Sequence, residues 1–585
     1  MSLKAVKFVV KQFLLLTLLI SITSCTVLQP KVTEDVNQRF DALLEDMAKE
    51  ALMNSPLSAT FTLGNLQEEG LDELASQLDH LSLDAIQEGI RLANNDLKAL
   101  KEINIADLTQ EQQKNYSLAE FNLTLGINRW KYLYSQNLIQ ASSGVQVDIP
   151  LALMQIEFEE KAEIDAFILR VQELPRLIDE VIGYEQERFS KGYGLPGYIY
   201  KDVEKQIEDM LVEPENFMMM LSFSERIDQY EGLTEEERVN YKKTYLDIIQ
   251  NQIYPALEKL KTQAINMESS KATGSISEWP DGKAYYEDLV AYMTSDELDV
   301  EGLEDWATEE INSITQQFQQ IIEENPTLLD TDFENALPSF QDMEAIRAAI
   351  NEVYQREFYD YDITFASENS IPEYLEDTLA AGFYFPITVD GEDYGNMYLQ
   401  NKDYEQPTAD TLMLYYHENI PGHHLYFSYI ANSEEPLYRK MNEYLAYEEG
   451  WATYCQNLSF ESMGLSDELA RFFKLNSDYS NAFMVLMDIQ LHYNGMSVEE
   501  IKEQFIGMGY TQDSVDSIVD RMISKPGETI HYMYGNDKMN QWKKQFQEAR
   551  GESFDVKEFH DFVLSHYGLP FYVVEGELDK VLTNE

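Results

Sequence analysis

The stretch Tyr416-His417-Glu418-Asn419-Ile420-Pro421-Gly422-His423-His424-Leu425 contains three of the eight histidines of this 585-residue chain. A His-Glu pair followed within two helical turns by another histidine is typical of zinc hydrolases, in which the imidazoles hold the metal. The carboxylate beside the first histidine takes a proton from the water that the zinc activates. The pattern predicts His417 as a zinc ligand and Glu418 as the general base.

The spacing differs from the motif His-Glu-x-x-His, whose histidines lie four residues apart on one helix face. His423 and His424 lie six and seven residues after His417. On an ideal helix, His424 would lie directly above His417. Pro421 cannot donate to the carbonyl of His417, so we expect a kink or a bulge, and a bulge of two residues would return His423 to the usual position. The spacing leaves the second ligand open between His423 and His424.

A second acidic motif follows in Tyr447-Glu448-Glu449-Gly450-Trp451-Ala452-Thr453-Tyr454. Its residues favour a helix, and its two adjacent carboxylates are well placed to supply a third metal ligand. Each motif alone is also compatible with an ordinary helix surface. Together the two motifs favour a metal site, because a soluble helix has little reason to gather such residues.

Three later residues are weaker candidates. Asp488 and His492 lie one helical turn apart, so they either pair behind the ligands or belong to the core. His560 is expected to be structural. None of these three predicts a specific chemical role.

The stretch from Lys525 to Gly535 contains His531, Tyr532 and Tyr534. A tyrosine hydroxyl near zinc is a good donor to the oxyanion that forms when water attacks an amide. The spacing does not choose among these three residues.

The chain begins with a basic segment and an apolar run over residues 13–22, and reaches Thr23-Ser24-Cys25. These features predict a bacterial lipoprotein signal peptide over residues 1–24, with Cys25 as the lipidated first residue of the mature chain. A plain secreted protein with an incidental cysteine is the alternative. Both interpretations predict export, the first with a lipid anchor at the membrane of the cell envelope.

Acidic residues outnumber basic ones by 105 to 43, for a formal net charge of −62. Such a charge keeps an exposed protein soluble and argues against binding of nucleic acid, whose phosphates it repels. Cys25 and Cys455 are the two cysteines, so acylation of Cys25 excludes an intrachain disulfide. We expect Cys455 to be a buried, inert thiol.

The apolar spacing predicts helices almost throughout residues 33–260, so the fold is expected to be mainly α. A Ser- and Gly-rich seam at residues 269–280 places the boundary between an N-terminal helical lobe (25–275) and a catalytic lobe (276–585). Residues 383–389 and 394–399 alternate around a turn at Asp390-Gly391, which predicts a β-hairpin beside the metal helix. Its edge strand is a candidate for hydrogen bonding to a peptide backbone, or the hairpin is purely structural.

These motifs resemble the bacterial family called domain of unknown function 885 (DUF885), whose members are taken to be zinc metallopeptidases related to the gluzincins and are often lipoproteins. The likeness covers nearly all of the mature chain. It rests on residues 55–60, the hairpin up to Asn401, His417-Glu418, Pro421-Gly422-His423, 449–452, Asp488, His492, Pro526-Gly527, Tyr532, Gly535 and 559–561.

The resemblance implies that His417 and His423 are ligands, because the family pattern is Pro-Gly-His. It further implies Glu449 as the third ligand and Tyr532 as the oxyanion donor. The segment after residue 448 is also similar to the Glu-Gly-Phe-Ala segment that supplies a zinc ligand in the large zinc aminopeptidases. Met484 departs from the family, in which arginine is expected, and this puts any contact with a substrate carboxylate at that position in doubt.

The expected protein is an exported zinc-dependent peptidase with one Zn²⁺ per chain. By analogy, its two helical lobes enclose a deep zinc-containing cleft that limits substrates to peptides or unfolded chain. One alternative is a zinc amidase acting on small acylated amino acids. The other is a catalytically silent lipoprotein that binds peptides, although a binding protein has no need of the general base Glu418.

Overall fold

A computed structural model describes residues 35–583 except 142–143, 297, 334–335, 372–381, 392–394 and 443. The signal peptide predicted over residues 1–24 and the lipidation site Cys25 lie outside the described residues. Within the described part, the prediction of a mainly helical fold is confirmed. No helix in this part is both long and apolar enough to cross a membrane.

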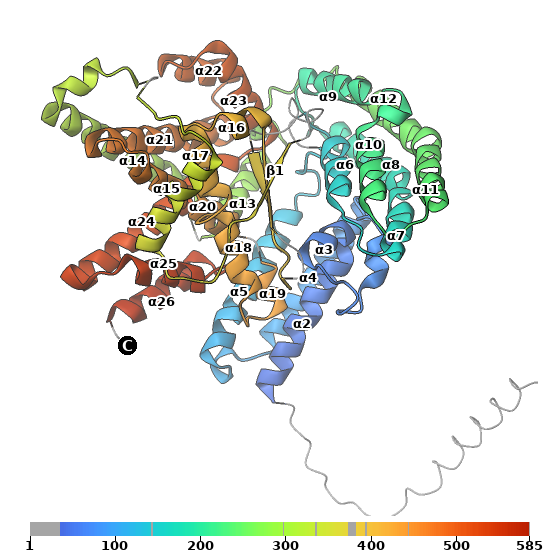
Figure 1. Cartoon of the computed structure of the whole chain (residues 1–585), viewed down its shortest axis with the longest axis horizontal. Helices are drawn as coiled ribbons and strands as arrows, with labels where there is room; N and C mark the ends of the chain where they lie inside the picture. The colour runs from blue at the N-terminus through green and yellow to red at the C-terminus, as the bar shows by residue number, and fades with distance from the viewer. Residues whose placement is uncertain are drawn as a thin grey trace, which may run out of the picture.

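Helices form the first half of the described chain, up to residue 267 (Figure 1). Capping boxes begin three of them, with Thr109 paired with Gln112, Glu160 with Glu163 and Thr234 with Glu237. The helices are α2 (Val36–Asn54), α3 (Pro56–Thr62), α4 (Leu83–Lys101), α5 (Gln110–Trp130), α6 (Val145–Gln155), α7 (Lys161–Val171), α8 (Leu174–Ser190), α9 (Gly197–Met210), α10 (Met218–Gln229), α11 (Glu235–Ile248) and α12 (Tyr254–Met267).

Helices also dominate the second half, which lies on the other side of the view in Figure 1. A π-helical turn (Gln490–Asn494) extends α21 beyond its α-helical part. The helices are α13 (Gly282–Thr294), α14 (Val300–Glu324), α15 (Met343–Glu357), α16 (Asn401–Glu405), α17 (Ala409–Glu418), α18 (His423–Ala431), α19 (Leu437–Lys440), α20 (Leu445–Ser462), α21 (Asp467–Ile489), α22 (Val498–Gly507), α23 (Gln512–Ser524), α24 (Glu528–Arg550), α25 (Val556–Ser565) and α26 (Phe571–Thr583).

The predicted hairpin is part of a three-stranded sheet of order β1-β3-β2. Strand β2 (Gly382–Phe385) pairs antiparallel with β3 (Asn396–Leu399), as expected. Strand β1 (Ser367–Ser370) pairs parallel with β3 and was not predicted, because its sequence Ser-Glu-Asn-Ser lacks the apolar alternation of a strand.

Strand β2 is shorter than the alternating pattern predicts. Proline follows Phe385 and cannot donate to the sheet, so the chain leaves β3 at this point. The N–H of Val389 donates instead to the carbonyl of Thr62, and the Asp390 carboxylate accepts from the N–H groups of Gly64 and Asn65. The connection between the strands therefore packs against the end of α3.

The apolar core consists of several clusters. One large cluster lies within residues 57–264 and also includes Ile371, whereas another is built mainly from residues 276–578. A third joins α9 and the end of α12 to α21, α22 and α23. The seam after α12 is non-helical apart from one short turn, and the lobe boundary placed there stays a prediction.

Candidate metal centre

The histidine motif is divided between two helices. The interruption expected at Pro421 as a kink or a bulge is a complete break, because α17 ends at Glu418 and α18 begins at His423. Pro421 has no N–H with which to continue α17. Gly422 passes so close to α17 that a Cβ atom there would lie 2.0 Å from the carbonyl oxygen of His417. The four-residue break brings His423 next to His417, with their ring centroids 4.8 Å apart.

Side chains from two directions hold this break. The buried Asn419 accepts from the N–H of Ala366 at 3.0 Å, which ties the break to the segment before β1. From α20, the indole N–H of Trp451 donates to the carbonyl of Pro421 at 3.0 Å, and the thiol of Cys455 contacts the same oxygen at 3.4 Å. Cys455 is fully buried, as predicted. Because Trp451 lies two residues after Glu449, the same contact positions the acidic helix against the break.

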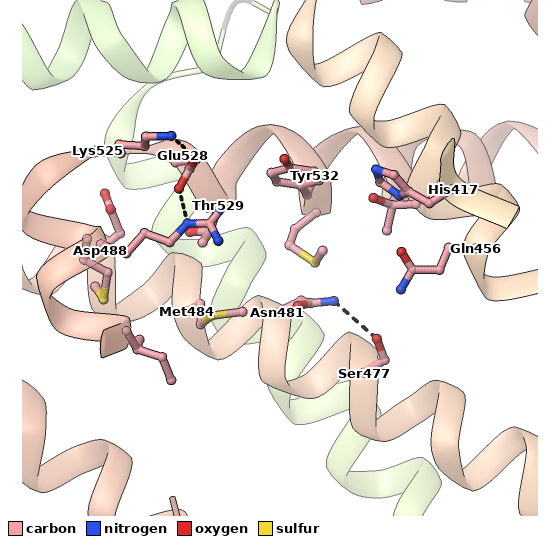
Figure 2. A pocket seen from close by; sticks show the side chains of 15 residues that line it. His417, Gln456, Ser477, Asn481, Met484, Asp488, Lys525, Glu528, Thr529 and Tyr532 are labelled. Carbon is pink, nitrogen blue, oxygen red and sulfur yellow. Dashed lines mark hydrogen bonds and ion pairs between the residues drawn. The ribbon is translucent and has the colours of Figure 1, made fainter. Parts of the chain in front are cut away.

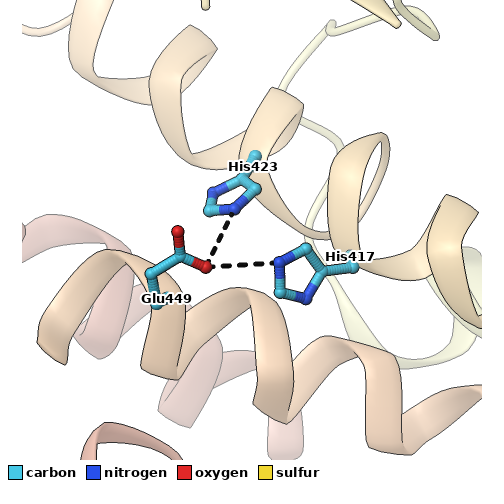
Figure 3. Close-up of side chains that lie close together, drawn as sticks. All are labelled: His417, His423 and Glu449. Carbon is cyan, nitrogen blue, oxygen red and sulfur yellow. Dashed lines mark ion pairs between the residues drawn. The ribbon is translucent and has the colours of Figure 1, made fainter. Parts of the chain in front are cut away.

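His417, His423 and Glu449 converge at one point (Figure 3). The Oε2 atom of Glu449 lies 3.3 Å from Nε2 of His417 and 3.4 Å from Nε2 of His423. Four ligand atoms arranged tetrahedrally at about 2.0–2.1 Å from Zn²⁺ lie about 3.3–3.4 Å from one another. The two separations from Glu449 Oε2 are compatible with this geometry, and the three side chains form a group that could hold a metal ion.

The electrostatics of the cluster also fit a metal. Glu449 Oε2 is buried and accepts no hydrogen bond from the described residues, although both histidine Nε2 atoms lie close to it. Burial raises the pKa of Glu449, but His423 and His417 outweigh this effect and hold the pKa well below its ordinary value. A carboxylate that stays ionised beside two imidazole nitrogens suits a divalent cation.

His424 is turned away from this cluster. Its Nε2 donates to the carbonyl of Thr364 at 2.9 Å, so its Nδ1 accepts from the Tyr384 hydroxyl at 2.8 Å. Burial lowers the pKa of His424 to about 4. Both ring nitrogens are engaged, and the structure gathers His423 rather than His424 with His417 and Glu449.

Glu418 lies beside the cluster and is partly buried. Burial, together with the negative charge of Glu449, raises the pKa of Glu418 to about 7, although His417 lowers it. The backbone N–H of Tyr384, on the outer strand β2, donates to the Glu418 carboxylate. The hairpin therefore lies next to the general-base candidate, and one N–H of its edge strand is already bonded there.

A close crossing of α20 and α24 brings Tyr532 to the same site. A Cβ atom on Gly535 would lie 1.7 Å from the carbonyl oxygen of Ala446, and one on Gly450 would lie 2.5 Å from Cα of Gly535. Only glycine fits at both positions. The ring centroid of Tyr532 lies 6.2 Å from that of His417 as a result.

The neighbours of Tyr532 have other surroundings. The Tyr534 hydroxyl donates to Asp296 at 2.8 Å, which commits it to another contact. His531 is buried with Nδ1 unpartnered, and burial lowers its pKa to about 4. Of these three residues, Tyr532 alone lines the cavity that begins at His417.

This cavity has a volume of about 320 Å³. In Figure 2, Tyr532 lies between His417 at one end and Lys525 and Glu528 at the other. All lining residues come from the second half of the chain, so a cleft between two lobes stays a prediction. They are His417, Thr453, Gln456, Ser477, Asn481, Met484, Asp488, Ile518, Arg521, Met522, Lys525, Glu528, Thr529, Tyr532 and Met533.

Asp488 holds the start of α24. Its carboxylate accepts from the Tyr286 hydroxyl and, at 3.0 Å, from the N–H of Gly527, the residue that precedes α24. Gly527 has φ +77°, a conformation that favours glycine. Asp488 therefore joins α13, α21 and α24, and it acts on Tyr532 through the placement of that last helix.

His492 and His560 are buried with both ring nitrogens bonded. His492 accepts from the N–H of Ile276 and donates to the carbonyl of Met522, which anchors the seam after α12. The ring of His560 lies between the carbonyl of Glu357 and the hydroxyl of Tyr454. Neither residue belongs to the metal cluster of the described chain.

Sequence reasoning missed several residues that shape the site. Asn419 was quoted only as part of the histidine stretch, and the contact of Gly450 with Gly535 joins helices far apart in the chain. Arg521, which lines the cavity, lies on a helix that carries no motif. Among these residues, the glycines in Glu-Gly-Trp-Ala and Tyr-Met-Tyr-Gly were the one available signal.

Comparison with protein families identifies the chain. Residues 56–578 match the family described as "Bacterial protein of unknown function (DUF885)", and the chain belongs to this family. No curated protein matches the chain.

Two solved structures share the fold. "The putative lipoprotein from Colwellia psychrerythraea" superposes with a TM-score of 0.81 at 18% identity, over 94% of this chain and 100% of that one. "A putative lipoprotein of unknown function from Shewanella oneidensis" superposes with a TM-score of 0.66 at 15% identity, over 93% of this chain and 100% of that one. At these identities the likeness concerns the fold alone.

Proposed function

We propose that this member of the DUF885 family is an exported zinc-dependent peptidase that hydrolyses the peptide bonds of peptides or unfolded chain. The observation that supports it most is the spacing of the His417 and His423 Nε2 atoms from Glu449 Oε2. These three atoms would hold one Zn²⁺ per chain. The buried Glu449 Oε2, which accepts no hydrogen bond from the described residues, supports the assignment.

The chain's own residues supply the remaining chemistry. When bound, Zn²⁺ acts as a Lewis acid that polarises a carbonyl and makes a water molecule more acidic. Glu418 takes the proton of the attacking water and passes it to the leaving amine, and a carboxyl with a pKa of about 7 suits both transfers. Tyr532 keeps its proton because burial and Glu449 raise its pKa, so its hydroxyl donates to the oxyanion.

The cavity beside the cluster sets the size of the substrate. A volume of about 320 Å³ lies at the lower end of ligand sites in proteins. It fits a few residues of extended chain, which favours peptides or unfolded chain as substrates. The same volume also fits a small acylated amino acid, which keeps a zinc amidase as the second candidate function.

A lipid anchor completes the proposal. The motif that ends at Cys25 is that of a lipoprotein signal, and the two structural neighbours carry lipoprotein descriptions. Acylation at Cys25 would hold the enzyme at a membrane outside the cytoplasm. Labelling with a radioactive fatty acid, in the natural chain and in Cys25→Ser, tests this part separately.

Metal content is the decisive first measurement. The full chain, purified without added metal, is expected to carry about one zinc, and His423→Ala is expected to lose it. His424→Ala is the matched control, because it removes the neighbouring imidazole while keeping the cluster, and it should retain zinc. Loss of zinc in His424→Ala alone would refute the ligand assignment.

Activity then separates the candidate functions. A mixed peptide library and a panel of acylated amino acids are offered to the zinc-loaded chain. Cleavage of peptides supports the peptidase, whereas cleavage of acylated amino acids alone supports the amidase. A zinc-loaded chain that binds peptides and cleaves neither panel would overturn the proposal in favour of a binding protein.

A further inference from the structure

The cavity carries positive charge at the end opposite His417. Arg521 on α23 and Lys525, one turn later, both line it. The side chain of Arg521 is 60% exposed, so a ligand entering the cavity can reach it. Cations are scarce in this chain, which has 43 basic and 105 acidic residues. Two of them at one end of a cavity beside a metal cluster therefore call for an explanation.

The two cations share a single ion-pair partner at this end of the cavity. Both pair with Glu528, whose Oε2 lies 2.5 Å from Nε of Arg521 and whose Oε1 lies 3.3 Å from Nζ of Lys525. Asp488 also lines the cavity, but it is 1% exposed and its two oxygens accept from Tyr286 and Gly527. One accessible carboxylate, that of Glu528, thus serves two cations, because the buried Asp488 carboxylate accepts from other groups.

The guanidinium of Arg521 has donors to spare. Its ion pair with Glu528 uses Nε, and among the described residues its two Nη groups have no hydrogen-bond acceptor. An arginine donates in parallel to both oxygens of a carboxylate when two of its N–H groups face the same side. The ligand that matches such a group is a carboxylate.

We propose that Arg521 and Lys525 bind a carboxylate of the substrate, at the end of the cavity away from His417. This inference rests on the proposed function, because it assigns the anionic end of a substrate whose scissile bond lies near the cluster. Tyr532 lies between the two ends, where an extended peptide would pass it (Figure 2). The carboxylate is either the C-terminal α-carboxylate, which makes cleavage occur close to the end of the chain, or an acidic side chain.

Glu528 occupies the carboxylate position in the free protein. It is held by the same two cations that would bind the substrate, and these cations lower its pKa although burial raises it. A substrate carboxylate must therefore share or displace this contact. The arrangement predicts that Glu528 weakens binding of carboxylate substrates.

Three matched peptides test the proposal. The first has neutral side chains and a free C-terminal carboxylate, the second is its C-terminal amide, and the third is the amide with Glu as the last residue. The wild-type chain is expected to cleave the first about 10- to 100-fold more efficiently, in kcat/KM, than the second, as for loss of one charged hydrogen-bonded contact. The third peptide identifies the source: cleavage at the rate of the first assigns side-chain carboxylates as well, and cleavage at the rate of the second assigns the α-carboxylate alone.

The variants locate the effect. Arg521→Ala and Lys525→Ala should lower kcat/KM for the first peptide toward that for the amide, mainly through KM, and Arg521→Lys should recover part of the loss. Glu528→Gln should lower KM for the first peptide and leave the amide unchanged. Lys502→Ala is the matched control, because Lys502 pairs with Asp516 outside the cavity, and it should behave as wild type.

Two measurements keep this inference separate from the proposed function. The carboxylate assignment would be overturned, with the peptidase intact, if the wild-type chain cleaved the first two peptides equally well. The same conclusion would follow if the ratio of their kcat/KM values were unchanged in the Arg521→Ala, Lys525→Ala double variant. Absence of any cleavage would overturn the peptidase. In that case, calorimetry would still measure the affinity of the chain for the first peptide and for its amide. Tighter binding of the first peptide would support the carboxylate assignment, and equal affinities would overturn it.

Discussion

The ion pair of α8 and the cluster of His417, His423 and Glu449 both place charged groups away from bulk water, but they differ in hydrogen bonding, and the α8 pair is the more deeply buried of the two. Arg188 and Glu185 are fully buried, and Arg188 also donates to the carbonyl of Tyr134 at 3.0 Å. Glu185 in turn accepts from the N–H of Leu138 at 2.8 Å.

In the cluster, by contrast, Glu449 Oε2 has the two histidine Nε2 atoms as close neighbours but accepts no hydrogen bond from the described residues. A buried charge whose groups are all hydrogen-bonded serves the fold. A carboxylate oxygen that converges with two imidazole nitrogens on one point suits a bound cation. Burial alone therefore does not identify a functional site, and the following predictions test this distinction from the largest expected effect to the smallest.

Glu418→Gln is expected to lower kcat by about 10²- to 10⁴-fold, because it removes the general base and keeps the shape of the side chain. Zinc content should not change, since Glu418 is not in the cluster. Steady-state kinetics and metal analysis on the same sample measure both quantities. Glu500→Gln, on the surface of α22, is the control and should keep full activity. A fully active Glu418→Gln would show that the base is assigned wrongly.

Arg188→Met is expected to lower the free energy of unfolding by about 3–5 kcal/mol, because it leaves Glu185 buried without its cation. The folded fraction should keep its zinc and its kcat. The shift of the denaturant midpoint measures the loss. The control is Lys259→Met on α12, which breaks an exposed ion pair with Asp179 of α8. It should lower the free energy of unfolding by less than about 1 kcal/mol. Loss of zinc in folded Arg188→Met would contradict the distinction between an ion pair that only stabilises the fold and a cluster that binds the metal.

Tyr532→Phe is expected to lower kcat by about 10²- to 10³-fold, as for loss of one oxyanion donor, with a smaller effect on KM. Tyr534→Phe removes a hydroxyl that is bonded to Asp296 instead, so it should keep kcat near the wild-type value. Kinetics of both variants on one peptide make the comparison. The reverse result would assign the donor role to Tyr534.

His560 on α25 resembles the α8 ion pair in being fully buried with its polar atoms bonded, and it links stability to pH. Burial lowers its pKa to about 3, against about 6.5 in the unfolded chain. The unfolded state therefore binds more protons below pH 6.5, so this stability is complete above that pH and is lost as the pH falls toward about 3. Between pH 7 and pH 5 the loss is about 2 kcal/mol. The free energy of unfolding of His560→Asn, measured at pH 7 and pH 5, should therefore change less with pH than that of the wild type. An unchanged pH dependence would contradict the role of His560.

Residue types and local spacing predicted much of the fold and part of the site. The helical periodicity is a local property, and the hairpin rested on alternation around a turn; both are found in the structure. His417 and Glu418 are recognisable because adjacent residues carry the motif. The choice of His423 over His424 was not accessible to spacing, because it depends on where α17 ends and on the contacts of His424 with Thr364 and Tyr384.

The sequence by itself determined the mainly helical fold, the acidic surface and the presence of metal-binding side chains, since these depend on composition and on neighbours along the chain. The tertiary structure alone decided which side chains meet. The contact of Gly450 with Gly535 places Tyr532 beside His417, and the packing of α23 places Arg521 in the same cavity. The physical reason is that these contacts join residues far apart in the chain, and close packing between helices rather than local preference determines their geometry.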